Sequence, residues 1–111
     1  MDPPTPRPIT TFTWDDMSTL VYQVDVDLIA VCRRAADNYV NGTKLLNLTA
    51  MSRGKRDSIL KHERLRSVVK CGPMRLKGVW IPLDRARELA RAVKVDAQVY
   101  PLLEEQVDAW V

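Results

Sequence analysis

Apolar and polar residues alternate between positions 20 and 26 of the chain. The apolar residues at every second position are Leu20, Tyr22, Val24 and Val26. Because successive side chains of a strand point to opposite faces, this pattern predicts a strand with one buried face. The apolar run 28–32 predicts a second, more buried strand, and a hairpin between the two strands is compatible with this spacing.

Two helix starts follow. Asn41 is a good N-cap for a helix over residues 43–48, and Ser52 can cap a second helix that runs toward Glu63. Ile59 and Leu60 are the expected buried residues of the second helix. With residues 50–52 as the connection, the pair fits a helix-turn-helix.

A turn at Gly72-Pro73 separates two segments rich in β-favouring residues, 67–70 and 76–81. They predict a β-hairpin with a basic tip. Pro82 and Asp84 start a third helix, whose core stripe is Leu83, Ala86, Leu89, Ala90 and Val93. The terminal piece 102–110 is expected to be helical.

The order helix, turn, helix, hairpin is that of a winged helix-turn-helix, so an α+β fold is expected. Residues 1–13 include four prolines and no periodicity, and they are expected to form a flexible tail before a single domain over 14–111. The length of 111 residues suits one domain. The longest apolar runs are five residues, which excludes a membrane span, and no secretory leader follows Met1.

The net charge of +3 is unevenly distributed along the chain. Residues 53–77 carry nine basic and two acidic side chains, a net charge of +7, whereas residues 1–31 carry a net charge of −4. A basic stripe between acidic ends is typical of proteins that bind a polyanion, although a basic solvated surface would give the same count. A helix fits the major groove of DNA and a hairpin can lie beside it. Both elements would be basic because contacts with phosphates dominate the affinity for DNA.

The candidate DNA-binding residues lie on the second helix and the hairpin: Arg53, Lys55, Arg56, Lys61, Arg64, Arg66, Lys70, Met74, Arg75 and Lys77. Cations at a helix N-terminus suit a phosphate clamp. Arg75 is the best candidate for a bidentate contact to guanine, with a phosphate contact nearly as probable on sequence grounds. Met74 at the hairpin tip suits a contact with a thymine methyl group or with a sugar, and its alternative role is that of a packed turn residue.

Other distinctive residues are expected to be structural. Asn41 is a helix cap, and Gly72 and Gly78 satisfy backbone shape. The aromatic residues expected in the core or against the sheet are Trp14, Tyr22, Trp80 and Tyr100.

No enzyme chemistry is visible in the sequence. His62 is the single histidine, and Cys32 and Cys71 are too few for a disulfide framework or a four-cysteine zinc site. There is no glycine-rich phosphate loop, HExxH or CxxC pattern, so neither a cofactor nor a metal is expected.

Four tracts of the chain resemble a known family: 40–47 (VNGTKLLN), 51–57 (MSRGKRD), 59–61 (ILK) and 68–82 (VVKCGPMRLKGVWIP). Together they are similar to the APSES domain of fungal transcription factors, in particular the StuA-like regulators, within the KilA-N superfamily. The resemblance covers residues 14–106. It implies a winged helix-turn-helix that binds duplex DNA with a CGCG-like core, in nuclear proteins that regulate development or the cell cycle.

The chain also departs from that family's pattern. Lys70 and Lys77 stand where the cell-cycle branch has base-contacting glutamines, and Ala50, Cys71 and Arg75 replace an expected glycine, branched aliphatic residue and histidine. Two questions stay open at this point. The fold could serve instead as a protein-interaction or chromosome-tethering module, and binding as a homodimer is possible.

Overall fold

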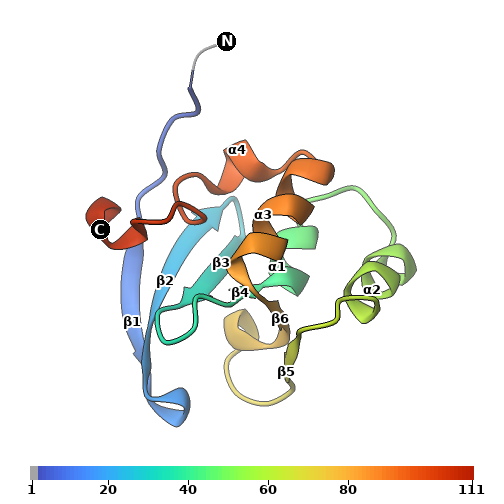
Figure 1. Ribbon diagram of the computed structural model, residues 1–111, viewed down its shortest axis with the longest axis horizontal. Coiled ribbons are helices and arrows are strands. Elements are labelled where there is room, and N and C mark those ends of the chain that lie inside the picture. The colour runs from blue at the N-terminus through green and yellow to red at the C-terminus, as the bar shows by residue number, and fades with distance from the viewer. Residues whose placement is uncertain (1–2) are drawn as a thin grey trace.

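A computed structural model describes residues 3–111. Its centre is a six-stranded antiparallel sheet in the order β1-β2-β3-β4-β6-β5 (Figure 1). The strands are β1 (Thr10–Trp14), β2 (Thr19–Val26), β3 (Ile29–Arg34), β4 (Val40–Asn41), β5 (Ser67–Val69) and β6 (Gly78–Ile81). The α-helices are α1 (Gly42–Leu46), α2 (Arg53–Lys61), α3 (Leu83–Ala92) and α4 (Asp96–Val99). Three short 3₁₀ helices are η1 (Asp15–Met17), η2 (Met74–Leu76) and η3 (Val107–Trp110). The predicted α+β class is confirmed.

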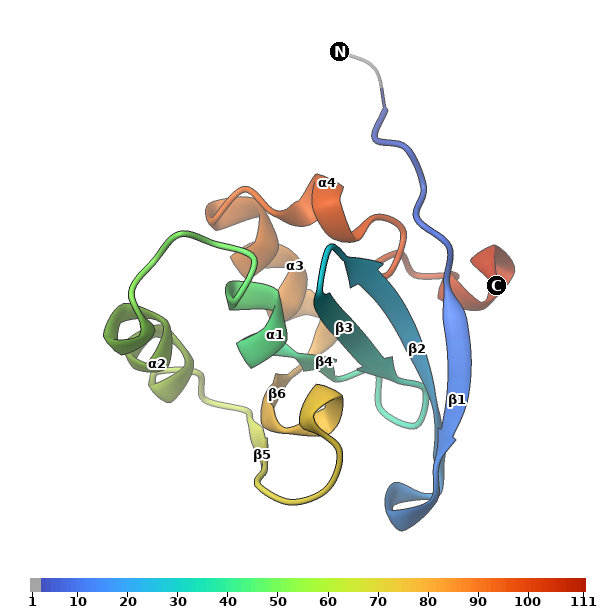
Figure 2. The same ribbon diagram turned by 180° about the vertical axis from the view of Figure 1, so that it is seen from behind.

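Helices α1, α3 and α4 pack with the sheet around the main core, while α2 lies at the opposite end of the molecule from β1 (Figures 1 and 2). The third helix buries its predicted stripe, with Ala86, Leu89 and Ala90 inside and Leu83 and Val93 half-buried. This placement leaves α2 as an outlying element whose surface is mostly open to solvent.

Both faces of β2 are covered, so the prediction of one buried face is incomplete. Val24 and Val26 belong to the main core, as expected. Leu20, on the same face, is 49% exposed, whereas Val21 on the opposite face is completely buried in a second cluster with Trp80. The second cluster exists because η2 folds back over this face and buries Leu76, which is a contact distant in sequence.

The predicted tail boundary at residue 13 lies inside β1, so the ordered region begins earlier than expected. Thr10–Trp14 pair with β2, and Ile9 is buried in the main core. The Arg7 backbone N–H donates to the Tyr100 carbonyl at 2.9 Å. Thr10–Trp14 form a strand because β2 offers an unpaired edge, which the local sequence of the tail does not reveal.

Both caps of the helix-turn-helix are confirmed. Asn41 accepts a hydrogen bond from the Lys44 N–H and Ser52 accepts one from the Lys55 N–H, each at 3.3 Å. The connection spans residues 47–52, which is longer than the expected 50–52. The Thr49 hydroxyl donates to the Leu46 carbonyl at 2.7 Å and caps the C-terminus of the first helix early.

The predicted terminal helix over 102–110 is wrong: this segment consists of turns that end in η3. Its carbonyls are used elsewhere. The Arg33 guanidinium donates to the carbonyls of Leu102 (2.8 Å) and Glu104 (2.6 Å), and the Arg87 guanidinium donates to that of Leu103 (2.6 Å). Because these carbonyls accept hydrogen bonds from arginine side chains, the segment does not form the backbone hydrogen bonds of a helix.

Candidate nucleic-acid interface

The N-terminal half of α2 presents cations to solvent. Arg53 and Lys55 are exposed, and Arg53 lies 3.8 Å from the Asp57 carboxylate, an exposed pair that contributes little to stability. Arg56 is half-buried and donates to the Met51 carbonyl at 2.7 Å. The helix therefore starts with two accessible positive charges beside backbone N–H groups, an arrangement that suits a phosphate.

The wing, defined here as residues 67–81, is the expected β-hairpin. Ser67 pairs with Trp80 and Val69 with Gly78, and the eight residues between the strands contain η2. Lys70 is exposed and Lys77 is half-buried on either side of this loop. The predicted basic tip is therefore present.

Asn41 joins the wing to α1. Its side chain is completely buried, and its Nδ2 donates to the carbonyls of Arg75 (3.2 Å) and Lys77 (3.0 Å). Its Oδ1 accepts the capping bond from Lys44. One side chain thus fixes the start of the first helix and the backbone of the wing, a second role beyond the expected cap.

Gly78 completes this joint. Its φ is +142°, and a Cβ there would stand 2.5 Å from Asn41 Oδ1 and 2.8 Å from Thr43 Cβ. The Thr43 hydroxyl accepts a bond from the Val79 N–H at 2.9 Å. The expected structural role of Gly78 follows from both the backbone angle and the close approach.

Helix α2 and the wing tip meet at a common hollow of about 340 Å³. It is lined by Thr43, Asn47, Arg53, Arg56, Asp57, Leu60 and Met74. Met74 is 67% exposed and is the wing's contribution to the hollow. The structure therefore brings the first half of α2 and the wing tip to one surface.

Arg75 is placed differently from the other candidates. Its guanidinium lies 3.7 Å from the centre of the Phe12 ring and donates to Gln23 Oε1 at 3.1 Å. Both partners belong to the β1–β2 hairpin. The side chain is directed at the sheet, away from the hollow that Met74 lines.

The C-terminal end of α2 belongs to a second hollow of about 630 Å³. Its lining residues are His62, Glu63, Arg64, Leu65, Pro82, Asp84 and Arg85. Lys61 is exposed nearby, and Arg66 donates to the carbonyls of Lys61 and Glu63. Arg64 thus faces the start of α3, and Arg66 is engaged with the backbone, so these two candidates are separated from the first hollow.

Glu63 and Arg85 form the main ion pair of this region. The Arg85 guanidinium donates two bonds to the buried Glu63 carboxylate, each 2.9 Å long. The hydrogen bond from Arg85 lowers the pKa of Glu63 below its ordinary value, although burial acts in the opposite direction. The pair ties the end of α2 to the start of α3 across 22 residues, a link that the sequence pattern did not indicate.

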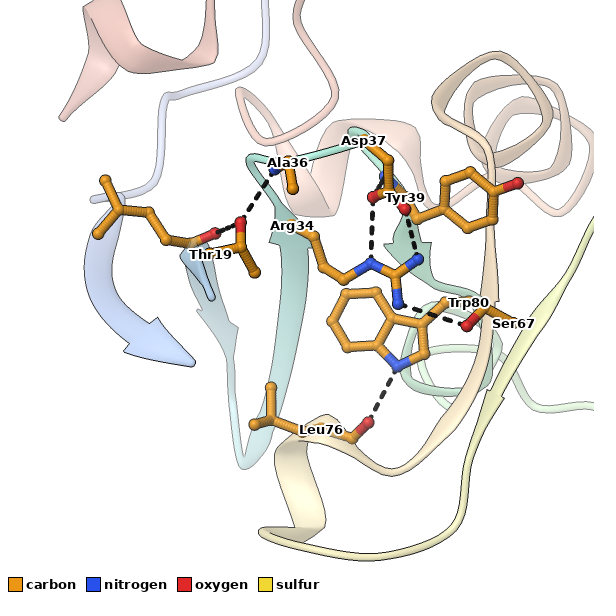
Figure 3. A network of polar contacts seen from close by, with 9 residues as sticks. Thr19, Arg34, Ala36, Asp37, Tyr39, Ser67, Leu76 and Trp80 are labelled. Carbon is orange, nitrogen blue, oxygen red and sulfur yellow. Dashed lines mark hydrogen bonds and ion pairs between the residues drawn. The ribbon is translucent and has the colours of Figure 1, made fainter. Parts of the chain in front are cut away.

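Two arginines that contribute to the net charge of the chain, Arg33 and Arg34, are buried. Arg34 donates to both Asp37 carboxylate oxygens, at 3.1 and 2.6 Å, and its guanidinium lies 5.1 Å from the centre of the Trp80 ring (Figure 3). Burial lowers the pKa of Arg33. Neither charge is available to a partner, so neither arginine belongs to the candidate interface.

Within residues 3–111 no cluster of three metal-ligating side chains occurs, and no helix there has the length and hydropathy needed to cross a membrane. Cys32 is buried, which raises the pKa of its thiol to about 12, and Cys71 is exposed.

A family model described as the KilA-N domain matches residues 23–103 of the chain. The chain belongs to the KilA-N domain family. This membership confirms the resemblance given by the four sequence tracts. The KilA-N match includes α1, α2 and the wing, and therefore the whole surface described above.

Two curated relatives of this KilA-N domain are fungal proteins. The transcriptional regulator EFH1 of Candida albicans is 54% identical over 99 residues, which are 89% of this chain and 14% of that protein. The cell pattern formation-associated protein stuA of Emericella nidulans is 50% identical over 108 residues, which are 96% of this chain and 17% of that protein. The chain thus spans less than a fifth of the length of either relative.

Two solved structures share the fold. The DNA complex of PCG2 superposes with a TM-score of 0.77 and 26% identity, and the match covers 88% of each chain. Mbp1 from Saccharomyces cerevisiae superposes with a TM-score of 0.72 and 28% identity over 85% of this chain and 97% of that chain. The winged helix-turn-helix class expected from the sequence is confirmed by this likeness.

Proposed function

We propose that this KilA-N domain binds duplex DNA sequence-specifically, as the DNA-binding part of a fungal transcription regulator that acts in the nucleus. The observation that carries the proposal is the convergence of two basic, non-contiguous segments. The first half of α2 and the tip of the wing line one hollow, with Arg53, Arg56 and Met74 around it.

The fold and the family support this proposal. The PCG2 domain, which was solved as a DNA complex, has the same fold over most of this chain. EFH1 and stuA are two relatives with about half of their aligned residues identical; by name, EFH1 is a transcriptional regulator and stuA is associated with cell pattern formation.

The ten candidate residues divide into three groups in this proposal. The first group would meet phosphates, and all of its members except the half-buried Lys77 are exposed: Arg53, Lys55, Lys61, Lys70 and Lys77. Met74 and Arg56 line the hollow beside them, and Met74 would contact a sugar or a thymine methyl group. Arg64, Arg66 and Arg75 belong to the periphery, because the guanidinium of Arg75 lies on Phe12 and Arg66 is bonded to the backbone.

Fluorescence anisotropy with a CGCG-containing duplex and a scrambled duplex tests the proposal. If about five cations meet phosphates, log affinity falls with log salt concentration at a slope of about −4 to −5. The CGCG duplex should bind more tightly than the scrambled one. Equal, weak binding to both would refute sequence-specific recognition and leave only non-specific electrostatics.

A pair of charge-matched variants locates the surface. Arg53→Ala should weaken binding and reduce the salt slope by about 1, since one phosphate contact is lost. Arg91→Ala removes an equal charge from the exposed side of α3, next to the α4 segment, and should leave both quantities unchanged. Equal effects of the two variants would show that binding depends on net charge and not on the α2–wing surface.

A further inference from the structure

Ser58 is an exposed hydroxyl within the most basic stretch of α2. Within the helix, Leu60 is the buried residue and Ile59 is half-buried, and Ser58 lies on the outward side. Three basic residues precede it, with Arg56 two positions, Lys55 three positions and Arg53 five positions before the serine. Kinases that select basic substrates recognise cations at these positions through an acidic groove.

We propose that Ser58 is a phosphorylation site for an arginine-directed serine/threonine kinase, and that its phosphate switches off binding to duplex DNA. The regulatory half of this proposal rests on the proposed function, whereas the modification itself does not.

The structure selects Ser58 among the hydroxyls with suitable neighbours. Three hydroxyl residues of the chain have a basic residue three positions before them: Thr10, Ser58 and Ser67. Thr10 is held in β1 opposite Gln23, and the Arg7 guanidinium before it donates to the Asp25 carbonyl at 3.2 Å.

Ser67 is also protected. It is half-buried in β5, pairs with Trp80, and accepts a hydrogen bond from Arg34 at 3.4 Å. Ser58 is exposed and makes no side-chain hydrogen bond within the described part of the chain. Thr10 is exposed too, but it is paired in β1 and its hydroxyl donates to the Gln23 carbonyl at 3.5 Å, so Ser58 is the one of the three that is exposed and not held in the sheet.

A kinase must bind its substrate in an extended form, and α2 can open at modest cost. The helix has nine residues, which is shorter than the roughly 12–15 that an isolated helix needs to persist in water. Leu60 is its one fully buried residue. Segments with so little buried surface open locally while the rest of the domain stays folded.

The modification is a phosphoryl transfer from MgATP. A new bond forms between Ser58 Oγ and the γ-phosphorus, the bond from that phosphorus to the ADP oxygen breaks, and the hydroxyl proton is taken up by the kinase's base. ADP leaves with the electron pair of the broken bond.

The added group carries about −1.5 to −2 charges at neutral pH. On the helix surface it would lie beside Lys55 three positions before it and Lys61 three positions after it. It would also lie in the last turn, where the carbonyl end of the helix disfavours an anion. The pairing with the lysines removes cationic surface from the proposed interface, and the position in the last turn destabilises the end of the helix.

The size of the effect follows from counterion release. Neutralising two phosphate contacts at about 0.15 M salt lowers the affinity about thirtyfold and makes the salt slope less steep by about 1.8. These two numbers distinguish loss of charge from general unfolding.

The first experiment maps the modification. The folded chain is incubated with MgATP and the purified catalytic subunit of an arginine-directed kinase, and the phosphorylated residues are identified by mass spectrometry. We expect phosphate on Ser58 in the wild type, and a large loss of incorporation in Ser58→Ala. Labelling of Thr10 or Ser67 in place of Ser58, or no labelling, would overturn the modification.

The second experiment measures its consequence. Phosphoserine is encoded at position 58, and a control chain carries phosphoserine in place of Ala109, an exposed residue of η3 at the opposite end of the molecule from α2 (Figure 1). The modified position 58 should lower duplex affinity about thirtyfold, whereas the control should change it less than threefold. Equal affinities of the two chains would overturn the switch.

The unmodified chain separates the two proposals. If it fails to bind either duplex, the proposed function fails and the switch fails with it, while the mapping experiment still decides whether Ser58 is modified. Circular dichroism of each chain establishes that an affinity loss does not come from global unfolding.

Discussion

Asn41 offers a direct test of how the wing is held. Its amide nitrogen donates to two wing carbonyls, and its amide oxygen caps α1. Asn41→Ala removes all three bonds. Asn41→Ser keeps a good N-cap but lacks the reach to the wing, so the two variants separate the cap from the joint.

The expected losses follow from the geometry. Each hydrogen bond to a wing carbonyl contributes about 1 kcal/mol net, so Asn41→Ser should destabilise the domain by about 2 kcal/mol. Loss of the cap adds about 1 kcal/mol, which brings Asn41→Ala to about 3 kcal/mol. The site is completely buried, so the carbonyls of Arg75 and Lys77 lose a partner that solvent replaces poorly.

Urea unfolding measures these losses through the transition midpoint, provided that the slope of the transition stays constant. Duplex affinity supplies the functional readout. Val99→Ala is the stability-matched control, because Val99 is completely buried in α4, away from the wing, and its truncation costs about 2 kcal/mol. Asn41→Ser should weaken duplex binding more than Val99→Ala does.

Two results would refute this reasoning. If Asn41→Ser unfolds at the same urea concentration as the wild type, the two wing bonds do not stabilise the fold. If Asn41→Ser and Val99→Ala bind duplex equally well, the joint contributes to stability but not to the placement of the wing.

Three other predictions follow from the same contacts. Trp80→Ala should cost about 3–5 kcal/mol in urea unfolding, because Trp80 is completely buried and packs on Trp14; a loss under 1 kcal/mol would contradict its place in the second cluster. Arg75→Ala should lower stability by about 1–2 kcal/mol through its lost contacts with Phe12 and Gln23, whereas an unchanged stability with weakened duplex binding would support the guanine contact expected from the sequence. The pKa of Glu63 is lowered in the folded state, so the stabilisation from its ion pair is present above its unfolded pKa of about 4.3 and is lost as pH falls through the folded value. The difference in free energy of unfolding between the wild type and Glu63→Gln should therefore disappear below about pH 4. A difference that does not depend on pH would contradict the ion pair.

Helices α1, α2 and α3 could be predicted because their signals are local, whereas the short α4 was not predicted. Asn41 and Ser52 each accept a capping hydrogen bond from an N–H group three residues later, and the apolar stripe of α3 repeats within one helix. The wing was predictable for the same reason, since Gly72-Pro73 lies between two β-favouring segments. These features need no information about distant residues.

The features that the sequence did not reveal depend on distant partners. β1 forms because β2 has an open edge, and the segment 102–106 stays irregular because Arg33 takes two of its carbonyls from about 70 residues away. Neither partner is marked by a pattern near the segment it controls. The tail-like composition of residues 10–14 and the helical tendency of residues 102–106 are then overridden by tertiary contacts.

The same distinction applies to the candidate interface. Charge counting identified the basic stretch 53–77, but it could not show which arginines near the wing contact the protein itself. Arg34 lies against Trp80 and Arg75 against Phe12, so two guanidinium groups near the wing support its position in the fold. An interface built from two separate segments requires that each be held rigidly, and the buried Asn41 does this for the wing by joining its backbone to the start of α1. The residues that orient such an interface are therefore chemically unlike the ones proposed to touch the ligand, and a search for basic side chains alone passes over them.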